Sequence, residues 1–224
     1  MKIIIFDSST IISLAMNGLL DLLTKLKKEF NGKFIITSKV KYESVDRPLE
    51  IKKFELGALK VKKLIDDKIL EPPESIGIQQ EEIRKKSQEM LRMCNHIFIA
   101  QNEYMHLIDE GEASCLVLSL LASEKGIDNI IAIDERTTRM LGEGPENLKK
   151  LLSQKLHIEI TMVKENALKP SKIKFIRSSE LVYVAWKKGL VELKDGKVLD
   201  ALLYATKFKG SAISYEEIEE IKRL

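Results

Sequence analysis

A chain of 224 residues fits one large domain, or a compact domain that carries an insertion. Its net charge of +3 excludes an overt polycation, so nucleic-acid binding would depend on local basic patches or on metal ions. The two cysteines form no CxxC pair and lie in apolar helical patterns, so we expect them to be buried and reduced. Because neither a signal peptide nor a stretch of membrane-spanning length is present, we expect a cytoplasmic protein without a membrane segment.

Short apolar runs alternate with helical patterns in the first part of the chain. Residues 3–6 and 34–37 predict strands, and the first of them is uniformly apolar, as in a strand buried on both faces of a sheet. Ser9 or Thr10 and then Ser38 stand where helix caps are expected after these strands. The helical pattern that follows the first strand is interrupted at Asn17-Gly18.

Residues 49–109 differ from this alternation. A Lys-rich helical pattern runs from residue 49 to 70, Pro72-Pro73 interrupts it, and a second helical pattern runs from residue 80 to about 109. We interpret this segment as a helical insertion beside the sheet. No linker flanks it, so the sequence predicts a single domain over residues 1–224.

The alternation resumes after the insertion. A helix is predicted from Gly111 to the stop signal at Gly126, and residues 130–133 predict a buried strand. Weaker strand patterns cover residues 157–163 and 173–176. Strands that alternate with helices predict an α/β fold with a central parallel sheet. Further helices are predicted at 136–139, 145–152, 181–190, 198–208 and 215–224, and the apolar residues Leu181, Val184 and Trp186 are expected in the core or in a dimer interface.

Four carboxylates are expected to meet at one edge of this sheet. Asp7 and Asp134 each end an aliphatic strand, and parallel strands end at the same edge, where open α/β sheets bind their ligands. Glu43 and Glu112 lie near the starts of the helices that would leave that edge. Each acid alone can be explained without a metal, since an Asp after a strand is often a helix cap and most glutamates are solvated.

The joint pattern favours a metal site. Carboxylates brought together repel one another, and a hard divalent cation such as Mg²⁺ or Mn²⁺ relieves this repulsion through oxygen ligands. Such ions activate water and stabilise the leaving oxygen of a phosphodiester, so the predicted chemistry is phosphodiester hydrolysis. Glu135 is an alternative ligand to Asp134, but as the second residue past the strand it is expected to point away.

Four stretches of the sequence resemble, in order and spacing, the four motifs of PIN-domain nucleases. They are IIIFDSSTIISLA, FIITSKVKYES, DEGEASCLVLSLLA and IIAIDERTTRML. The carboxyl-terminal stretch from Ser178 resembles the tail of archaeal PIN-domain proteins. The resemblance covers most of the chain except about 49–109 and 142–172, and it implies a three-layer PIN-like fold and metal-dependent ribonuclease activity. Toxins of the virulence-associated-protein-C type belong to this family, so the expected partners are RNA and an antitoxin protein, with a homodimer as the assembly.

Carried over to this sequence, the resemblance implies that Asp7, Glu43, Glu112 and Asp134 bind the metal. It also implies that Ser9 orients the first Asp or a phosphate, and that Arg139 contacts substrate. A salt bridge on a helix face explains Arg139 at least as well. Glu135 and Ser178-Ser179 depart from the family pattern, as does the length of the chain. The alternative function is a non-catalytic PIN-like module that binds RNA or protein. A late basic cluster of Lys169, Lys172, Lys174 and Arg177 is either an RNA contact or a solvated face.

Overall fold

The computed structural model describes residues 1–163 and 173–224, and within them it shows an α/β fold built on a parallel sheet. Among these residues the sheet has five strands in the order β3-β2-β1-β6-β8, and every neighbouring pair is parallel. The predicted fold class is thereby confirmed. The strands are β1 (Lys2–Phe6), β2 (Lys33–Ile35), β3 (Leu70–Glu71), β6 (Asp128–Ala132) and β8 (Phe175–Ile176).

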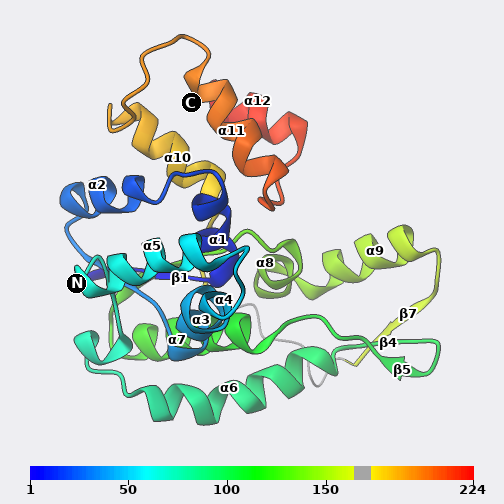
Figure 1. Ribbon diagram of the computed structural model, residues 1–224. Coiled ribbons are helices and arrows are strands. Elements are labelled where there is room, and N and C mark those ends of the chain that lie inside the picture. The colour runs from blue at the N-terminus through cyan, green and yellow to red at the C-terminus, as the bar shows by residue number, and fades with distance from the viewer. Residues whose placement is uncertain (164–172) are drawn as a thin grey trace.

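Helices cover both faces of the sheet and give three layers (Figure 1). Helix α7 (Glu110–Glu124) packs against β1 and β6, and α6 (Gln80–Asn95) lies outside it against α7. Across the sheet, α1 (Ser8–Met16) and α2 (Asp21–Glu29) both pack against α10 (Ser178–Lys187). The helical path is interrupted between α1 and α2 at Asn17 and Gly18, as the sequence predicts, because Gly18 adopts a φ of 70°.

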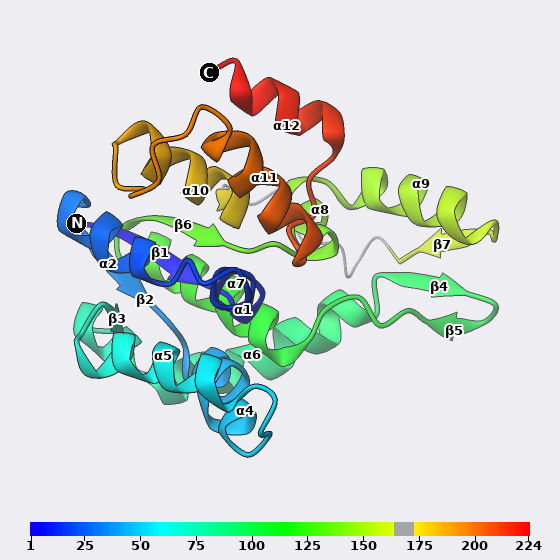
Figure 2. The ribbon, with the colours of Figure 1, turned by 45° about the horizontal axis from the view of Figure 1, so that its top comes forward.

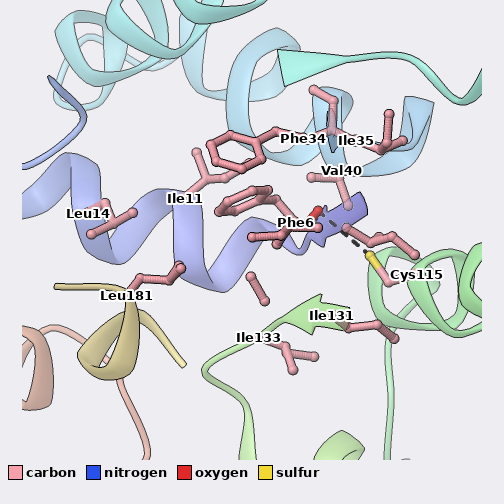
Figure 3. Packing of buried hydrophobic residues seen from close by; sticks show 14 of the residues in the cluster. Phe6, Ile11, Leu14, Phe34, Ile35, Val40, Cys115, Ile131, Ile133 and Leu181 are labelled. Carbon is pink, nitrogen blue, oxygen red and sulfur yellow. Dashed lines mark hydrogen bonds between the residues drawn. The ribbon is translucent and has the colours of Figure 1, made fainter. Parts of the chain in front are cut away.

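The core is formed where β1 and β2 run beneath these helices. Four of the five β1 residues are buried, which confirms a strand covered on both faces. The rings of Phe6 and Phe34 meet edge to face with centroids 5.1 Å apart, and Cys115 of α7 approaches the Phe6 carbonyl from the opposite side (Figure 3). Both Cys94 and Cys115 are buried and free, as predicted.

The segment after β2 is a chain of short helical turns. Helix α3 (Ser38–Lys41) continues into a π-helical turn, η1 (Tyr42–Asp46), and then into α4 (Arg47–Leu49). The predicted cap is shifted by one residue, because Thr37 rather than Ser38 accepts the amide hydrogen bond, from Val40. The π turn holds one more residue per turn than an α-helix would, and it carries Glu43.

The predicted helical nature of residues 49–109 is only partly correct. Helices α5 (Glu55–Asp66) and α6 are present, with a 3₁₀ turn, η2 (Pro73–Ile76), between them. The same segment also supplies β3 to the main sheet, and β4 (Phe98–Ala100) with β5 (Glu103–Tyr104) to a second sheet. Strands of two or three residues form because of their pairing partners, so they leave almost no period-2 pattern in the sequence.

The second sheet is antiparallel and extends away from the main body. Strand β7 (Ile160–Met162) pairs with β4, and α9 (Pro145–Leu156) contacts β7. Both ribbon views show this arm of β4, β5, β7 and α9 on one side of the molecule (Figures 1 and 2). The strand predicted at residues 157–163 therefore exists, but it lies outside the parallel sheet.

The remaining helices are α8 (Arg136–Glu143), α11 (Val198–Phe208) and α12 (Tyr215–Lys222). Helices α10, α11 and α12 lie together on one side of the molecule (Figure 2). Leu181 is buried in this layer, whereas Trp186 is 39% exposed. Over residues 1–163 and 173–224, no helix has both the length and the apolar character to cross a bilayer.

The predicted basic cluster is only partly visible. Lys169 and Lys172 lie outside the described residues. Lys174 pairs with Asp128, and the buried Arg177 pairs with Glu180 and Glu217. The two described members of the cluster are therefore engaged in ion pairs within the fold.

Candidate active site

Asp7 leaves β1 and caps the first helix. Its Oδ2 atom accepts hydrogen bonds from the Ser9 amide (2.9 Å) and the Ser9 hydroxyl (2.5 Å), which is how an N-cap residue closes the first turn. Its other oxygen, Oδ1, is buried and has no hydrogen-bond partner in the structure. Capping therefore accounts for one half of the carboxylate and leaves the other half unexplained.

Asp134 lies two residues beyond the end of β6, and only one of its carboxylate oxygens has a hydrogen-bond partner, as in Asp7. The side chain is 1% exposed, and its Oδ1 atom accepts a hydrogen bond from the Ser178 amide (2.8 Å) at the start of α10. Its Oδ2 atom is also buried without a hydrogen-bond partner. The Asp134 amide donates to the Ser9 hydroxyl (3.1 Å), so Ser9 bridges the two aspartates.

Glu112 is held at the start of α7 by a capping box. Its Oε2 atom accepts from the Asp109 amide (2.8 Å), and its Oε1 atom accepts from the Thr138 hydroxyl of α8 (2.7 Å). Burial raises the pKa of the Glu112 carboxyl to about 7, and the negative charge of Asp7 adds to this shift. The two hydrogen bonds to Glu112 favour its ionised form, but they only partly offset the effect of burial on its pKa.

Glu43 reaches the same region from η1. Its Oε2 atom accepts from the Ser8 hydroxyl (2.9 Å), next to Asp7. Burial raises the pKa of Glu43, and the charge of Asp7 acts in the same direction. Burial likewise raises the pKa of Asp7, although the hydrogen bonds from Ser9 oppose it. Three acids with raised pKa values therefore lie at one place, as expected where desolvated like charges gather.

A cleft of about 760 Å³ opens over this region. Asp7, Glu43 and Glu112 line it, whereas Asp134 does not and is linked to the cleft residue Ser9 by its backbone amide. Glu135 also lines the cleft, so the expectation that it points away was wrong. The exposed Glu135 accepts from the Thr137 amide as the N-cap of α8. The cleft lining is completed by Ser8, Ser9, Lys39, Arg47, Leu91, His106, Leu107, Ile108, Asp109 and Glu110.

Arg139 lies elsewhere in the described structure. Its Nη2 atom donates to the Ala212 carbonyl (3.0 Å), close to Arg177 and Glu217, and its Nε atom is buried without a hydrogen-bond partner. The structure thus brings together Asp7, Ser9, Glu43, Glu112 and Asp134. A substrate contact by Arg139 stays a prediction.

A comparison of the chain with protein-family models, curated proteins and solved structures finds no match. The site is therefore defined by its own geometry. Sequence reasoning missed the groups that hold the acids in place: Ser8, Thr138 and the Ser178 amide. Thr138 lies four residues after Asp134 on a helical pattern, which could have suggested a shared site. Ser178 lies 44 residues away from Asp134, and no local signal connects them.

The donor set of this site suits a hard cation. Mg²⁺ and Mn²⁺ prefer carboxylate oxygens, and the two orphaned oxygens of Asp7 and Asp134 are buried acceptors that a cation would satisfy. In the described part of the chain, no three His, Cys, Asp or Glu side chains already stand close enough together to form a metal site. Binding of an ion by all four acids would therefore draw their side chains closer together.

Gly111 offers a direct test of Glu43. A Cβ atom at residue 111 would clash with Glu43 Oε2, so Gly111→Ala must displace the glutamate side chain. We expect this variant to stay folded, since Ala favours helix, and to bind Mn²⁺ at least roughly tenfold more weakly, the scale seen when ligand-orienting groups are lost. Calorimetric titration with Mn²⁺ measures the change. Gly57→Ala, whose Cβ would meet no atom within 4 Å, is the matched control on α5. Equal affinity in Gly111→Ala and wild type would show that Glu43 is not a ligand.

Proposed function

We propose that this protein is a Mg²⁺- or Mn²⁺-dependent ribonuclease that hydrolyses RNA phosphodiester bonds. The observation that supports the proposal is the pair of buried, unpartnered oxygens on Asp7 and Asp134, at the ends of adjacent parallel strands. The hydrogen bonds to helix amides use only the other oxygen of each carboxylate. A buried acceptor without a hydrogen-bond partner destabilises the fold. A bound cation would supply the missing partner.

Asp7, Glu43, Glu112 and Asp134 would hold the ion. When bound, a divalent ion activates water and stabilises the charge that develops on the phosphate oxygens. Lys39 and the exposed Arg47 line the cleft beside the acids, and we assign them to the phosphates of the RNA strand. Ser9 would keep Asp7 and Asp134 in register, since its hydroxyl bonds to both.

The proposal includes the setting in which the enzyme acts. RNA is the substrate, the compartment is the cytoplasm, and the assembly is a homodimer in which the exposed Trp186 is a candidate contact. An antitoxin protein is a candidate partner. The alternative is a non-catalytic module that binds RNA or protein, and the experiment below separates it from the enzyme.

Metal binding is the first expected result. Wild-type protein should bind Mn²⁺ in a calorimetric titration and cleave single-stranded RNA, and a chelator should stop the cleavage. Asp7→Asn should bind Mn²⁺ at least roughly tenfold more weakly, because it replaces a charged ligand with a neutral one. Asp21→Asn, on α2, is a matched control outside the cleft.

Three outcomes of this experiment are distinct. Binding and cleavage that are lost together in Asp7→Asn support the enzyme. RNA binding without cleavage at any metal concentration indicates the non-catalytic module. If neither wild type nor Asp7→Asn binds Mn²⁺, the metal-dependent enzyme is excluded.

A further inference from the structure

A second pocket adjoins the acidic cleft on the side of α6. It has a volume of about 430 Å³, within the range of small-ligand sites, and lies between the α3–η1 segment, α6 and α7. Lys39, Leu91 and Glu110 line both the pocket and the cleft, so the two are continuous. The pocket contains none of the four acids that we assign to the metal. It is therefore a neighbouring site to which the proposed reaction gives no role.

The lining of this pocket combines a ring, an apolar floor and hydrogen-bonding edges. Tyr42 is 48% exposed and contributes an aromatic ring, and Ile83 and Leu91 supply the apolar surface. Gln80 and Gln88 of α6 add amides, which both donate and accept hydrogen bonds. Proteins recognise an unstacked base with this combination, by stacking on an aromatic side chain and by hydrogen bonds to the base edges.

The positive charge of Lys39, where the pocket meets the cleft, fits an RNA strand that continues from one into the other. The Lys39 ammonium lies 5.2 Å from the centre of the Tyr42 ring and 2.6 Å from a Glu110 carboxylate oxygen. That ion pair is largely exposed, since the Glu110 side chain is 61% accessible, and exposed pairs of this kind contribute little free energy. A phosphate that links the two sites could therefore replace Glu110 as the partner of Lys39.

We propose that this pocket holds one unstacked nucleobase of the RNA substrate, stacked on Tyr42 and adjacent to the bond that is cut. The inference rests on the proposed function and adds a base-binding subsite to it. One wall of this subsite is α6, which belongs to the segment 49–109. That segment would then supply the wall that selects the base. A second groove, of about 480 Å³, also includes Glu43 and Arg47 and has the Phe54 ring in its lining, but most of its surface is apolar and its lining has no side-chain amide.

The test compares Tyr42 with a tyrosine in a similar setting. Tyr215 is 53% exposed and has the Lys207 ammonium 4.3 Å from its ring centre, but it lies on α12 and does not line the pocket. A short, fluorescently labelled single-stranded RNA of mixed sequence is titrated in chelator, and anisotropy gives the Kd. Tyr42→Ala should weaken binding roughly tenfold, which corresponds to about 1.4 kcal/mol of stacking free energy. Tyr42→Phe should restore it, and Tyr215→Ala should bind as wild type does.

Cleavage products give a second readout. With Mn²⁺ present, sequencing of product ends from a random RNA pool should show a base preference beside the cut, and Tyr42→Ala should flatten it. Gln88→Ala should alter which base is preferred. Because Tyr42 and Gln88 are exposed, thermal melting should be unchanged in these variants.

The outcomes separate the subsite from the enzyme. If wild type binds and cuts RNA while Tyr42→Ala matches it in both Kd and base preference, the subsite is wrong and the ribonuclease stands. Equal losses in Tyr42→Ala and Tyr215→Ala, or a larger loss in Phe54→Ala in the second groove, also overturn the subsite. If wild type neither binds nor cuts RNA, both proposals fail.

Discussion

Asp134→Asn is expected to reduce RNA cleavage by roughly two to three orders of magnitude, the usual effect of removing one group that stabilises charge in a transition state. The substitution keeps the shape of the side chain. The amide oxygen of Asn can still accept the hydrogen bond from the Ser178 amide, so the contact with α10 survives. What is lost is the negative charge and the second oxygen, which the structure leaves buried and unpartnered. Initial rates with Mn²⁺ and thermal melting curves measure the two effects separately.

Two controls make this result specific. Asp128→Asn changes an exposed carboxylate at the opposite end of β6 and should cleave at the wild-type rate. Glu135→Gln tests the neighbouring acid that lines the cleft. If Glu135→Gln loses activity while Asp134→Asn keeps it, Glu135 is the ligand and our assignment is wrong.

Glu112→Gln is expected to stabilise the protein at alkaline pH when divalent ions are absent. The pKa of Glu112 is raised from 4.5 to about 7 in the folded state, so between these values the folded state binds more protons than the unfolded state. Stability must then fall as the pH rises from about 4.5 to about 7, by up to about 3 kcal/mol. Glutamine carries no charge to desolvate and can still complete a capping box, so this loss disappears.

The measurement is the melting temperature at pH 8, where the variant should melt about 5 °C or more above wild type. Added Mn²⁺ should stabilise wild type more than Glu112→Gln, because the ion binds the carboxylate. Glu146→Gln, an exposed glutamate in the first turn of α9, is the control and should melt as wild type does. A variant that melts below wild type at pH 8 would contradict the idea that ionised Glu112 destabilises the fold.

The central sheet could be predicted from sequence because its information is local. The aliphatic run in β1 is followed directly by Asp7, and the aliphatic run at residues 130–133, which overlaps the end of β6, is followed by Asp134. Burial of these runs follows from their composition. By contrast, β3 and β4 have two and three residues, and only their pairing with distant strands makes them strands. For this reason the sequence did not predict β3, β4 or β5.

The grouping of the acids at one edge of the sheet could be predicted from the sequence, whereas the contacts that hold them could not. Asp7 and Asp134 are marked by the strands that they follow. Three contacts hold the acids: the bridge through Ser9, the hydrogen bond from the Thr138 hydroxyl and the hydrogen bond from the Ser178 amide. They join segments that are brought together only by the tertiary fold, so no local pattern encodes them. The family pattern put Arg139 at the substrate, but the structure has it donating to the Ala212 carbonyl.

The π-helical turn η1 has a consequence for how this protein can change. Tyr42 and Glu43 are neighbours in that turn, so their side chains point in different directions around its axis. Tyr42 therefore lines the pocket beside α6, while Glu43 lines the acidic cleft. Deleting one residue from the turn would rotate both side chains together. Substrate choice and metal binding thus depend on the rotation of the same turn. A point substitution can alter one of them alone, but an insertion or deletion in the turn would alter both.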